Sequence, residues 1–307
     1  MIGMKRCILS IAALVLAVFP ADAGGPGYEA LPFLRLQRDP SALTAGAAQV
    51  FASQAYSVFS NPTLPFAVEE SGGLALSYSR WAANETNEFD ACGAFKISSR
   101  FSLGVGFSYG LNPEYDVYTD AGDISGSFSP ADMIAGIGAG YRITDVFSLG
   151  VNVRYASSRL TESYSYGAFS GDLFVAMRRS RLTATVGVSN LGPSVKSFST
   201  GSYSLPSSAS VGLGYNEALG EAVVARIQLT GDCYLSGAVS AGAGAEMIIK
   251  DLLSLRMGYN YGGESVIPSF ASAGIGLKTA GFEFNAALYL AGKDIGNSIS
   301  AGLGFRF

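Results

Sequence analysis

A few carboxylate side chains in this sequence could do acid–base chemistry if the fold brought them together. Glu246 and Glu283 could form such a pair, but no nucleophile and no oxyanion-binding pattern accompanies them. Histidine is absent, which excludes Ser-His-Asp and Cys-His catalysis and the common histidine zinc sites. The sequence therefore predicts no enzyme, no metal site and no cofactor.

Two further patterns resemble ligand sites without meeting their requirements. Glycines at a spacing of two, as in Gly136, Gly138 and Gly140, mimic part of a phosphate loop, but no helix follows to hold a phosphate. The long connection near residue 115 is acidic but lacks the regular ligand spacing of a calcium loop. Its carboxylates are Glu114, Asp116, Asp120 and Asp123. We interpret them as a solvated surface.

The N-terminus predicts a secretory signal peptide over residues 1–23. A basic pair, Lys5 and Arg6, precedes an apolar run, and Ala21-Asp22-Ala23 supplies the small residues of a cleavage site. Cys7 lies inside the apolar run without a lipoprotein box, so we expect no lipid anchor. Cleavage leaves 18 basic and 23 acidic residues, and this mildly acidic balance argues against a nucleic-acid partner.

The rest of the chain predicts membrane-spanning strands. Mean hydropathy is +0.29, yet no later run approaches the ~18 apolar residues of a spanning helix. From Gly72 onward, about fourteen segments of roughly ten residues alternate between apolar and small or polar positions, most clearly in 101–110, 147–155 and 253–262. We predict an all-β fold, a 14-stranded antiparallel transmembrane β-barrel over residues 67–307, in the outer membrane of a Gram-negative bacterium and in contact with its lipid.

Connections and aromatic residues favour this barrel over a soluble β-sandwich. Short turns alternate with longer connections, of which 112–131, 157–167 and 190–206 should be external. Aromatic residues cluster where strands end, as interfacial girdles do: Tyr78, Trp81, Tyr109, Tyr141, Tyr155, Tyr259 and Tyr261. The last strand ends on Phe305 and Phe307, a pattern similar to the signal by which outer-membrane barrels are recognised for assembly.

The inward face of the predicted barrel is rich in glycine and should leave space. A fourteen-stranded barrel is wider than its own side chains can fill, so we expect residues 24–66, mostly small and apolar, to form a plug. Charges on this face could hold the plug or guide a solute, but ordinary ion pairing in a wet lumen is favoured. They include Arg142, Arg154, Arg226, Glu246, Arg256 and Glu283. Cys92 and Cys233 could form a disulfide or remain two small thiols on distant strands.

The plug carries a pattern that resembles the PorV/PorQ family of outer-membrane proteins, nearer the PorQ type. The matching residues are Phe33, Leu34, Asp39, Ala42, Gly46, Ala48, Asn61 and Pro62, with Ser41, Ala45 and Thr63 departing from the family pattern. Asn190, Leu191 and Gly192 form a second match. The resemblance implies a FadL-like barrel with an N-terminal hatch, and a role with translocon or attachment-complex proteins of type IX secretion.

These observations lead to three functional hypotheses. The first is a non-enzymatic scaffold or shuttle in type IX protein secretion and surface attachment, with the external loops contacting the partner. The alternative is a FadL-like transporter of hydrophobic solutes, which needs an apolar pocket in the lumen and a side opening, often at a kinked strand. We find no proline inside any predicted strand and few bulky inward apolar residues beyond Phe174 and Tyr289. A general porin comes third, since an occupied lumen should conduct poorly.

Overall fold

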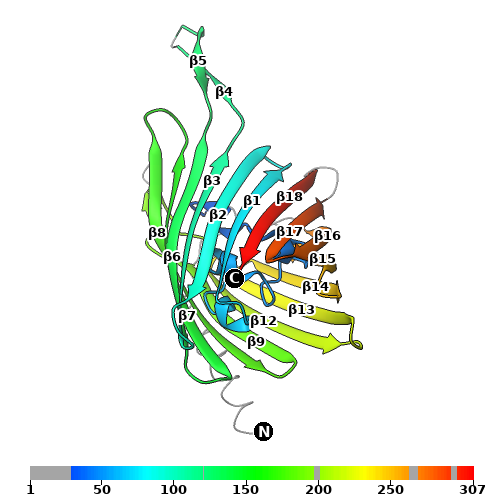
Figure 1. Ribbon diagram of the computed structural model, residues 1–307. Helices are drawn as coiled ribbons and strands as arrows, with labels where there is room; N and C mark the ends of the chain where they lie inside the picture. Colours follow the sequence, from blue (N-terminus) through cyan, green and yellow to red (C-terminus); the bar gives the residue numbers. More distant parts are fainter. Residues whose placement is uncertain (1–28, 120, 197–200, 263–268, 292–295) are drawn as a thin grey trace.

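The chain folds into a closed antiparallel β-barrel, here described from a computed structural model (Figure 1). The structure describes residues 29–307 except 120, 197–200, 263–268 and 292–295, so the predicted signal peptide lies outside the described residues. Fourteen strands close the barrel, which confirms the predicted number. In barrel order they are β1 (Gly72–Trp81), β2 (Thr86–Lys96), β3 (Phe101–Leu111), β6 (Ala131–Arg142), β7 (Phe147–Arg159), β8 (Ser165–Arg179), β9 (Leu182–Leu191), β12 (Ser208–Ala218), β13 (Val223–Tyr234), β14 (Val239–Ile249), β15 (Leu253–Gly262), β16 (Phe270–Thr279), β17 (Phe282–Leu290) and β18 (Asn297–Arg306).

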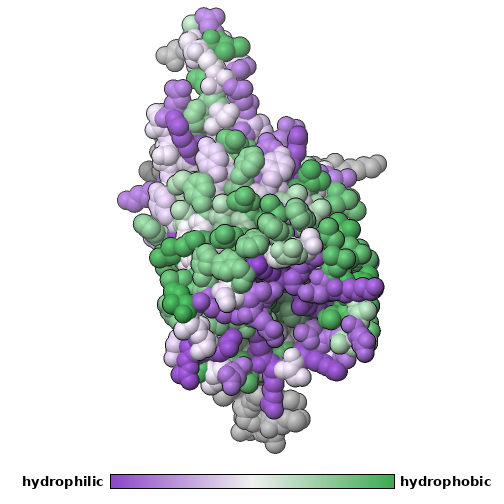
Figure 2. All heavy atoms as spheres, in the orientation of Figure 1, coloured by the Kyte–Doolittle hydropathy of each residue, from purple (hydrophilic) through white to green (hydrophobic). Residues whose placement is uncertain are grey.

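Alternation along the strands separates an apolar outer face from a small or polar inner face. On β3, Leu103, Val105 and Phe107 are exposed on the outside, while Ser102 and Ser108 are buried inside. Figure 2 shows a band of hydrophobic residues across the middle of the visible face, with hydrophilic residues above and below it. Because strands in a bilayer must satisfy every backbone group, this closed ladder with an apolar belt is the sheet structure that lipid tolerates.

The two ends of the barrel differ in the length of their connections. At one end, which we call the turn end, short turns such as 143–146, 180–181 and 280–281 join neighbouring strands. The other end, the loop end, carries the hairpin of β4 (Tyr115–Tyr118) and β5 (Ile124–Phe128), which stands clear of the barrel (Figure 1), and the short pair β10 (Val195–Lys196) and β11 (Ser202–Tyr203). Outer-membrane barrels place their short turns toward the periplasm.

Two predictions about this end are wrong in detail. The external loop predicted over 157–167 is shorter, because β7 and β8 remain paired as far as Arg159 and Ser165. Trp81 does not face lipid as a girdle residue. It lies on the inner face with Ser77 and Ser79, where its ring packs 5.5 Å from that of Tyr289.

Residues 29–71, which we call the inner segment, lie inside the barrel (Figure 1). They contain only short elements, η1 (Pro32–Arg35), α2 (Pro40–Leu43), η2 (Gln54–Phe59) and η3 (Leu64–Ala67), and most of their side chains are buried. No helix among the described residues is long and apolar enough to cross a membrane. The inner segment enters the wall at Gly72, whose backbone exchanges hydrogen bonds with Phe307 and so joins the first strand to the last.

The two cysteines of the wall are free thiols on opposite faces of the barrel. Cys92 is buried on the inner face of β2, and Cys233 is exposed on β13. The structure therefore has no bridge between them. The two cysteines are far apart because many strands separate β2 from β13 in either direction around the barrel.

Candidate functional site in the barrel interior

A buried arginine fixes the start of the inner segment to the wall. Arg38 is 2% exposed, and its guanidinium lies 2.8 Å from Glu88 Oε1 and 3.4 Å from Asp90 Oδ1 of β2. Its Nε also donates to Ser108 Oγ of β3 at 3.1 Å. An arginine buried between two carboxylates holds its segment firmly, since removing either charge would leave the other without a counter-ion. The sequence analysis missed Arg38, although a charge inside a segment expected to be buried was the available signal.

A second polar cluster holds the middle of the inner segment against β7 and β8. Arg154 Nη2 lies 2.6 Å from Asp172 Oδ1, and both side chains are almost fully buried. The cluster donates to backbone carbonyls of the inner segment: Arg154 Nη1 to Phe59 at 3.3 Å, and Asn152 Nδ2 to Ser57 and Ser60 at 3.1 Å each. Arg154, a predicted lumen charge, thus contacts the predicted plug. Sequence spacing alone could not show that Asp172 pairs with Arg154 or that Asn152 binds the plug beside it.

The predicted motif Asn190, Leu191 and Gly192 ends β9 and completes this cluster. Asn190 adopts a left-handed conformation with φ of 58°. Its backbone N–H donates to Asp172 Oδ1 at 2.9 Å, and its side-chain Oδ1 accepts from Arg154 Nη2 at 2.9 Å. The pairing of β8 with β9 shifts register between Gly171 and Leu173 at the same place. Asparagine tolerates the left-handed region better than other non-glycine residues, which explains its place at this bend.

Two residues of the predicted plug motif shape its turns. Asp39 caps α2, accepting from Ser41 N at 2.8 Å and Ser41 Oγ at 2.7 Å, and also accepts from Ser53 N at 2.6 Å. Burial raises the pKa of the Asp39 carboxyl, while the bonds from Ser53 and Ser41 act in the opposite direction. Asn61 accepts from Thr63 N and Oγ1 at 2.9 and 2.8 Å, a local turn of the kind that asparagine favours.

The remaining residues of the plug motif contribute close packing rather than side-chain hydrogen bonds. Leu34, Ala42 and Ala48 are buried, Phe33 is half-buried, and Pro62 lies where a side chain at Gly150 would be. Gly46, with φ of 69°, rests directly on wall glycines of β14 and β15. The structure therefore gives each motif residue a place in the inner segment, and none of them forms a catalytic arrangement.

The segment Thr44–Phe51, which we call the barrier segment, meets the wall differently. Its backbone at Ala45 and Gly46 lies against Gly242, Gly244 and Gly258, so close that a Cβ on any of these would overlap it. Within the described part of the chain, two hydrogen bonds join it to the wall: Gly46 N to Ser272 Oγ at 3.3 Å and Phe51 N to Gln228 Oε1 at 3.1 Å. Both bonds are uncharged, so this contact lacks the charge-assisted bonds found around Arg38 and Arg154.

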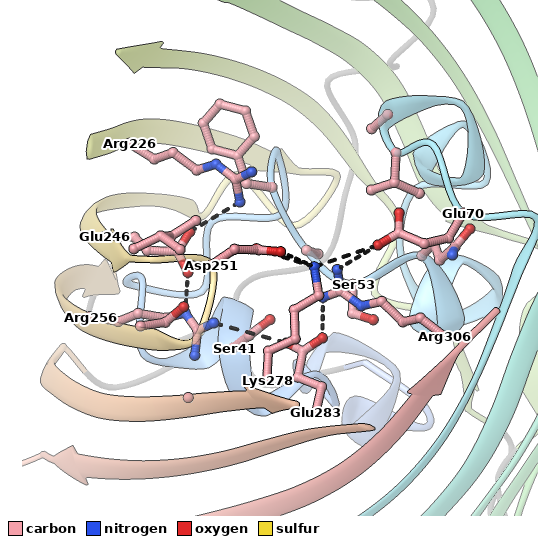
Figure 3. Close-up of a pocket in the computed structure, with 18 of the residues that line it drawn as sticks. Ser41, Ser53, Glu70, Arg226, Glu246, Asp251, Arg256, Lys278, Glu283 and Arg306 are labelled. Atoms are coloured by element: carbon pink, nitrogen blue, oxygen red, sulfur yellow. Dashed lines mark hydrogen bonds and ion pairs between the residues drawn. The ribbon is translucent and has the colours of Figure 1, made fainter. Parts of the chain in front are cut away.

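A charged chamber of about 720 Å³ lies below the barrier segment, toward the turn end (Figure 3). Eight side chains of alternating sign line it in one continuous chain. The chain runs from β13 around the wall to Glu70 of the inner segment and then returns to the wall at Lys278 and Asp251. The links are Arg226–Glu246 at 3.3 Å, Glu246–Arg256 at 2.7 Å, Arg256–Glu283 at 4.0 Å, Glu283–Arg306, Arg306–Glu70 at 3.5 Å, Glu70–Lys278 at 3.7 Å and Lys278–Asp251 at 2.9 Å. The predicted lumen charges Arg226, Glu246, Arg256 and Glu283 all belong to it.

Glu70 connects this chain to the inner segment. Burial acts to raise the pKa of the Glu70 carboxyl, but its own backbone amide, Arg306 and Lys278 outweigh burial and lower that pKa below its usual value. Glu246 and Glu283, considered above as a carboxylate pair, instead both bind Arg256. Arg142, the remaining predicted lumen charge, lies apart with its guanidinium 5.0 Å from the Phe66 ring of the inner segment.

A smaller polar pocket of about 70 Å³, the loop-side pocket, lies above the barrier segment. Hydroxyl, amide and carboxyl groups line it, among them Ser210, Thr230, Asp232, Ser240 and Asn260. Two buried amide nitrogens at this pocket, Gln37 Nε2 and Asn260 Nδ2, have no hydrogen-bond partner among the described residues. The pocket therefore favours an occupant that carries acceptor oxygens.

Apolar side chains gather elsewhere, between the start of the inner segment and the loop end. Leu31 and Leu34 pack with Val58 and Phe59 against Ile134 of β6. Val195 of β10 and Leu205 cover them from the loop side, with Tyr203 at the edge. We call this group the apolar cluster. It is the largest buried apolar cluster among the described residues.

Comparison with solved structures finds this architecture in transport barrels. The P. putida toluene transporter TodX superposes with a TM-score of 0.66 at 12% identity, covering 89% of this chain and 99% of TodX. The Ralstonia pickettii toluene transporter TbuX gives 0.61 at 11% identity over 87% and 98%. A Pseudomonas aeruginosa FadL homologue gives 0.51 at 11% identity over 88% and 97%. The chain has the FadL-type barrel fold.

The fold is that of bacterial outer-membrane barrels, in agreement with the predicted outer-membrane location. No protein-family model matches the sequence, and no curated protein matches it. TodX and TbuX are described as toluene transporters. They support the FadL-like part of the resemblance found in the sequence and do not support the narrower PorV/PorQ assignment.

Proposed function

We propose that this chain is a non-enzymatic outer-membrane transporter of small hydrophobic solutes, with the inner segment acting as its plug. The observation that carries the proposal is a FadL-type barrel whose inner segment packs an apolar cluster at the loop end, where a solute from outside would arrive. TodX and TbuX, barrels of the same fold, are described as toluene transporters. This function is the alternative hypothesis that the residues of the chain led to above.

The apolar cluster provides the surface that such a solute needs. Leu31 is fully buried in it, and Leu34 and Leu205 are 4% and 1% exposed. The Leu31 backbone is held locally by η1, and Ala30 N donates to Ser204 O at 2.9 Å, so the start of the inner segment is joined to the loop above it. A hydrophobic solute would bind by burying its own apolar surface against these side chains, at about 25 cal/mol per Å² removed from water.

Binding of a hydrocarbon to the detergent-purified protein tests this function. We expect saturable toluene binding by calorimetry, and at least about a ten-fold weaker Kd after Leu205→Asn, because a polar group is placed in the apolar cluster without a partner. Leu43→Asn is the matched control, since Leu43 is equally buried but packs in a separate cluster with Phe270 and Tyr289. Absence of saturable binding of toluene and of long-chain fatty acid would refute the proposal.

A second function, partner binding of the PorV/PorQ type, is favoured by the hairpin β4–β5. Tyr118 and Ile124 are 60% and 62% exposed on it, and the described residues of the connection between β3 and β6 include Glu114, Asp116 and Asp123 but no basic residue. Tyr115 anchors its base through a 2.8 Å bond to Leu160 O. An anchored hairpin with exposed apolar side chains suits contact with another protein.

Deletion of residues 115–128 separates the two functions. A scaffold in type IX secretion would lose its cargo proteins from the cell surface and medium when the hairpin is deleted, while toluene binding would be unchanged because the apolar cluster lies within the barrel. An unaltered surface proteome after deletion of the whole gene would exclude the secretion role. Mass spectrometry of surface and secreted proteins provides the measurement.

A further inference from the structure

We propose that this barrel also passes small polar solutes, along a path between β12–β16 and the inner segment that the barrier segment Thr44–Phe51 closes. The two ends of the path are the loop-side pocket and the charged chamber. This inference does not depend on hydrophobic transport, because it concerns the other side of the lumen and another class of solute.

The order of residues along three neighbouring strands places the barrier segment between the two cavities. On β13, Arg226 lines the chamber, Gln228 binds the barrier segment, and Thr230 lines the loop-side pocket. The same order holds on β14, with Glu246, Gly244 and Ser240, and on β15, with Arg256, Gly258 and Asn260. Displacement of one short segment would therefore join the pocket to the chamber.

The wall behind the barrier segment is largely glycine, so few side chains would refill the path. Gly212 and Gly214 of β12 face Val50 and Phe51, and Gly274 of β16 faces Thr44, in addition to the glycines under Ala45 and Gly46. A glycine band alone would not indicate a path. Here it connects two polar cavities, and the segment that covers it is held to the wall by two uncharged hydrogen bonds.

Unpartnered polar groups identify the class of solute. Gln37 Nε2 and Asn260 Nδ2 offer N–H donors in the loop-side pocket. The Gln54 amide, 2% exposed, lines the chamber, and no residue in the described part of the chain satisfies its donor or its acceptor. The chamber chain has four positive and four negative members, so it favours neither cations nor anions. A small neutral solute rich in hydroxyl groups fits both cavities.

Tethering the barrier segment to the wall tests this path. In a background with Cys92→Ser and Cys233→Ser, we would introduce Val50→Cys with Gly212→Cys, because a Val50 methyl lies 2.8 Å from the position of a Cβ at residue 212. The matched control is Val58→Cys with Gly104→Cys, where the Val58 Cβ lies 3.8 Å from the corresponding position, within the range for a disulfide. Mass spectrometry verifies each bridge, and heat-modifiable migration verifies the folded barrel.

The readout is arabinose entry into proteoliposomes, together with conductance in potassium chloride. We expect the oxidised Val50/Gly212 pair to lower arabinose entry at least about ten-fold and reduction to restore it, since the bridge removes the open state. The oxidised Val58/Gly104 pair should leave arabinose entry unchanged. Toluene binding should be unchanged by the Val50/Gly212 bridge, so failure of the polar path is distinguishable from failure of the hydrophobic function.

A second pair of variants keeps the test independent of disulfide formation. Val50→Ala loosens the barrier segment and should raise arabinose entry, whereas Val58→Ala, at an equally buried valine on the other side, should not. Arabinose entry no greater than that of protein-free liposomes would overturn the proposal. Equal effects of the two bridges, or no effect of the Val50/Gly212 bridge, would overturn it as well.

Discussion

The inner segment has two sides that contact the same kind of wall in different ways. On the side of β2 to β8, which we call the clamped side, Arg38 and Arg154 form buried ion pairs, and carbonyls of the inner segment accept bonds from the wall. On the side of β12 to β16, the barrier segment rests on glycines with two uncharged hydrogen bonds. Glycines such as Gly104 and Gly106 also line the clamped side. The two sides therefore differ in their buried ion pairs and not in the glycine content of the wall.

This difference predicts that the two sides of the inner segment differ in how easily they leave the wall. A side fixed by paired buried charges cannot leave the wall without exposing an unpaired charge to a poorly solvated interior, which is costly. The barrier segment packs on the wall through its backbone and through the side chains of Thr44, Val50 and Phe51, and the Arg226 guanidinium lies 5.3 Å from the centre of the Phe51 ring. When it moves, it gives up dispersion, this cation–π contact and two uncharged hydrogen bonds, but Arg226 keeps its pairing with Glu246. The clamped side should therefore stay in place while the barrier segment opens.

The largest effect should come from breaking the clamp at Arg38. Arg38→Met leaves Glu88 and Asp90 buried without their counter-charge, and should lower the free energy of unfolding by about 3 to 5 kcal/mol. Urea unfolding in detergent micelles, followed by heat-modifiable migration, measures it. Arg142→Met serves as control, because Arg142 is only half-buried and makes one 3.5 Å bond to Phe66 O.

Removing the carboxylate charges together with Arg38 sharpens this test. The triple variant Arg38→Met, Glu88→Gln and Asp90→Asn should recover a large part of the lost stability, because no unpaired charge remains. If Arg38→Met unfolds like the unchanged protein, the clamped side is not held by charge and the comparison fails.

A wall glycine beneath the barrier segment should give the next largest effect. Gly258→Ala places a methyl group against the backbone of Gly46 and should cost about 1 to 3 kcal/mol through overpacking, while displacing the barrier segment. Gly231→Ala is the control, because its nearest neighbours lie 3.7 Å or more away and the change should cost less than about 0.5 kcal/mol. Unfolding and arabinose entry are both measured.

Accessibility compares the two sides directly. In the background without native cysteines, Ala48→Cys on the barrier segment should react with a small maleimide about ten-fold faster than Val58→Cys on the clamped side, since local opening costs less there. Both positions are fully buried, so exposure in the closed state does not favour either. Equal labelling rates would contradict the proposed difference in mobility.

The smallest effect concerns Glu70, which links the inner segment to the chamber. Because its pKa in the fold is lowered, its pairing stabilises the protein above the ordinary value of 4.5 and is lost as the pH falls through the lowered pKa. Glu70→Gln should cost roughly 0.5 kcal/mol at pH 7, since the pair is partly exposed. The difference between the two proteins should vanish in stronger acid; unfolding curves that stay apart there would count against this link.

Much of the architecture could be predicted because it depends on local alternation. Segments such as 101–110 carry their apolar and small residues at a period of two, and a closed sheet is the solution for such strands in lipid. The inward position of Arg154, Arg226 and Glu246 followed from the same period. Strand limits were less predictable, since β7 and β8 extend through pairing with each other into residues that resemble a loop.

Contacts across the lumen could not be predicted in the same way. Arg38 meets Glu88 and Asp90 some fifty residues later, and Trp81 turns inward because the period of β1 continues to its last residue. The sequence by itself determined the barrel, the number of its strands and the face of most strand residues, because these depend on short-range periodicity. Only the tertiary structure decided which side of the inner segment is clamped and where cavities remain, because both depend on how a segment without periodicity packs against fourteen strands at once.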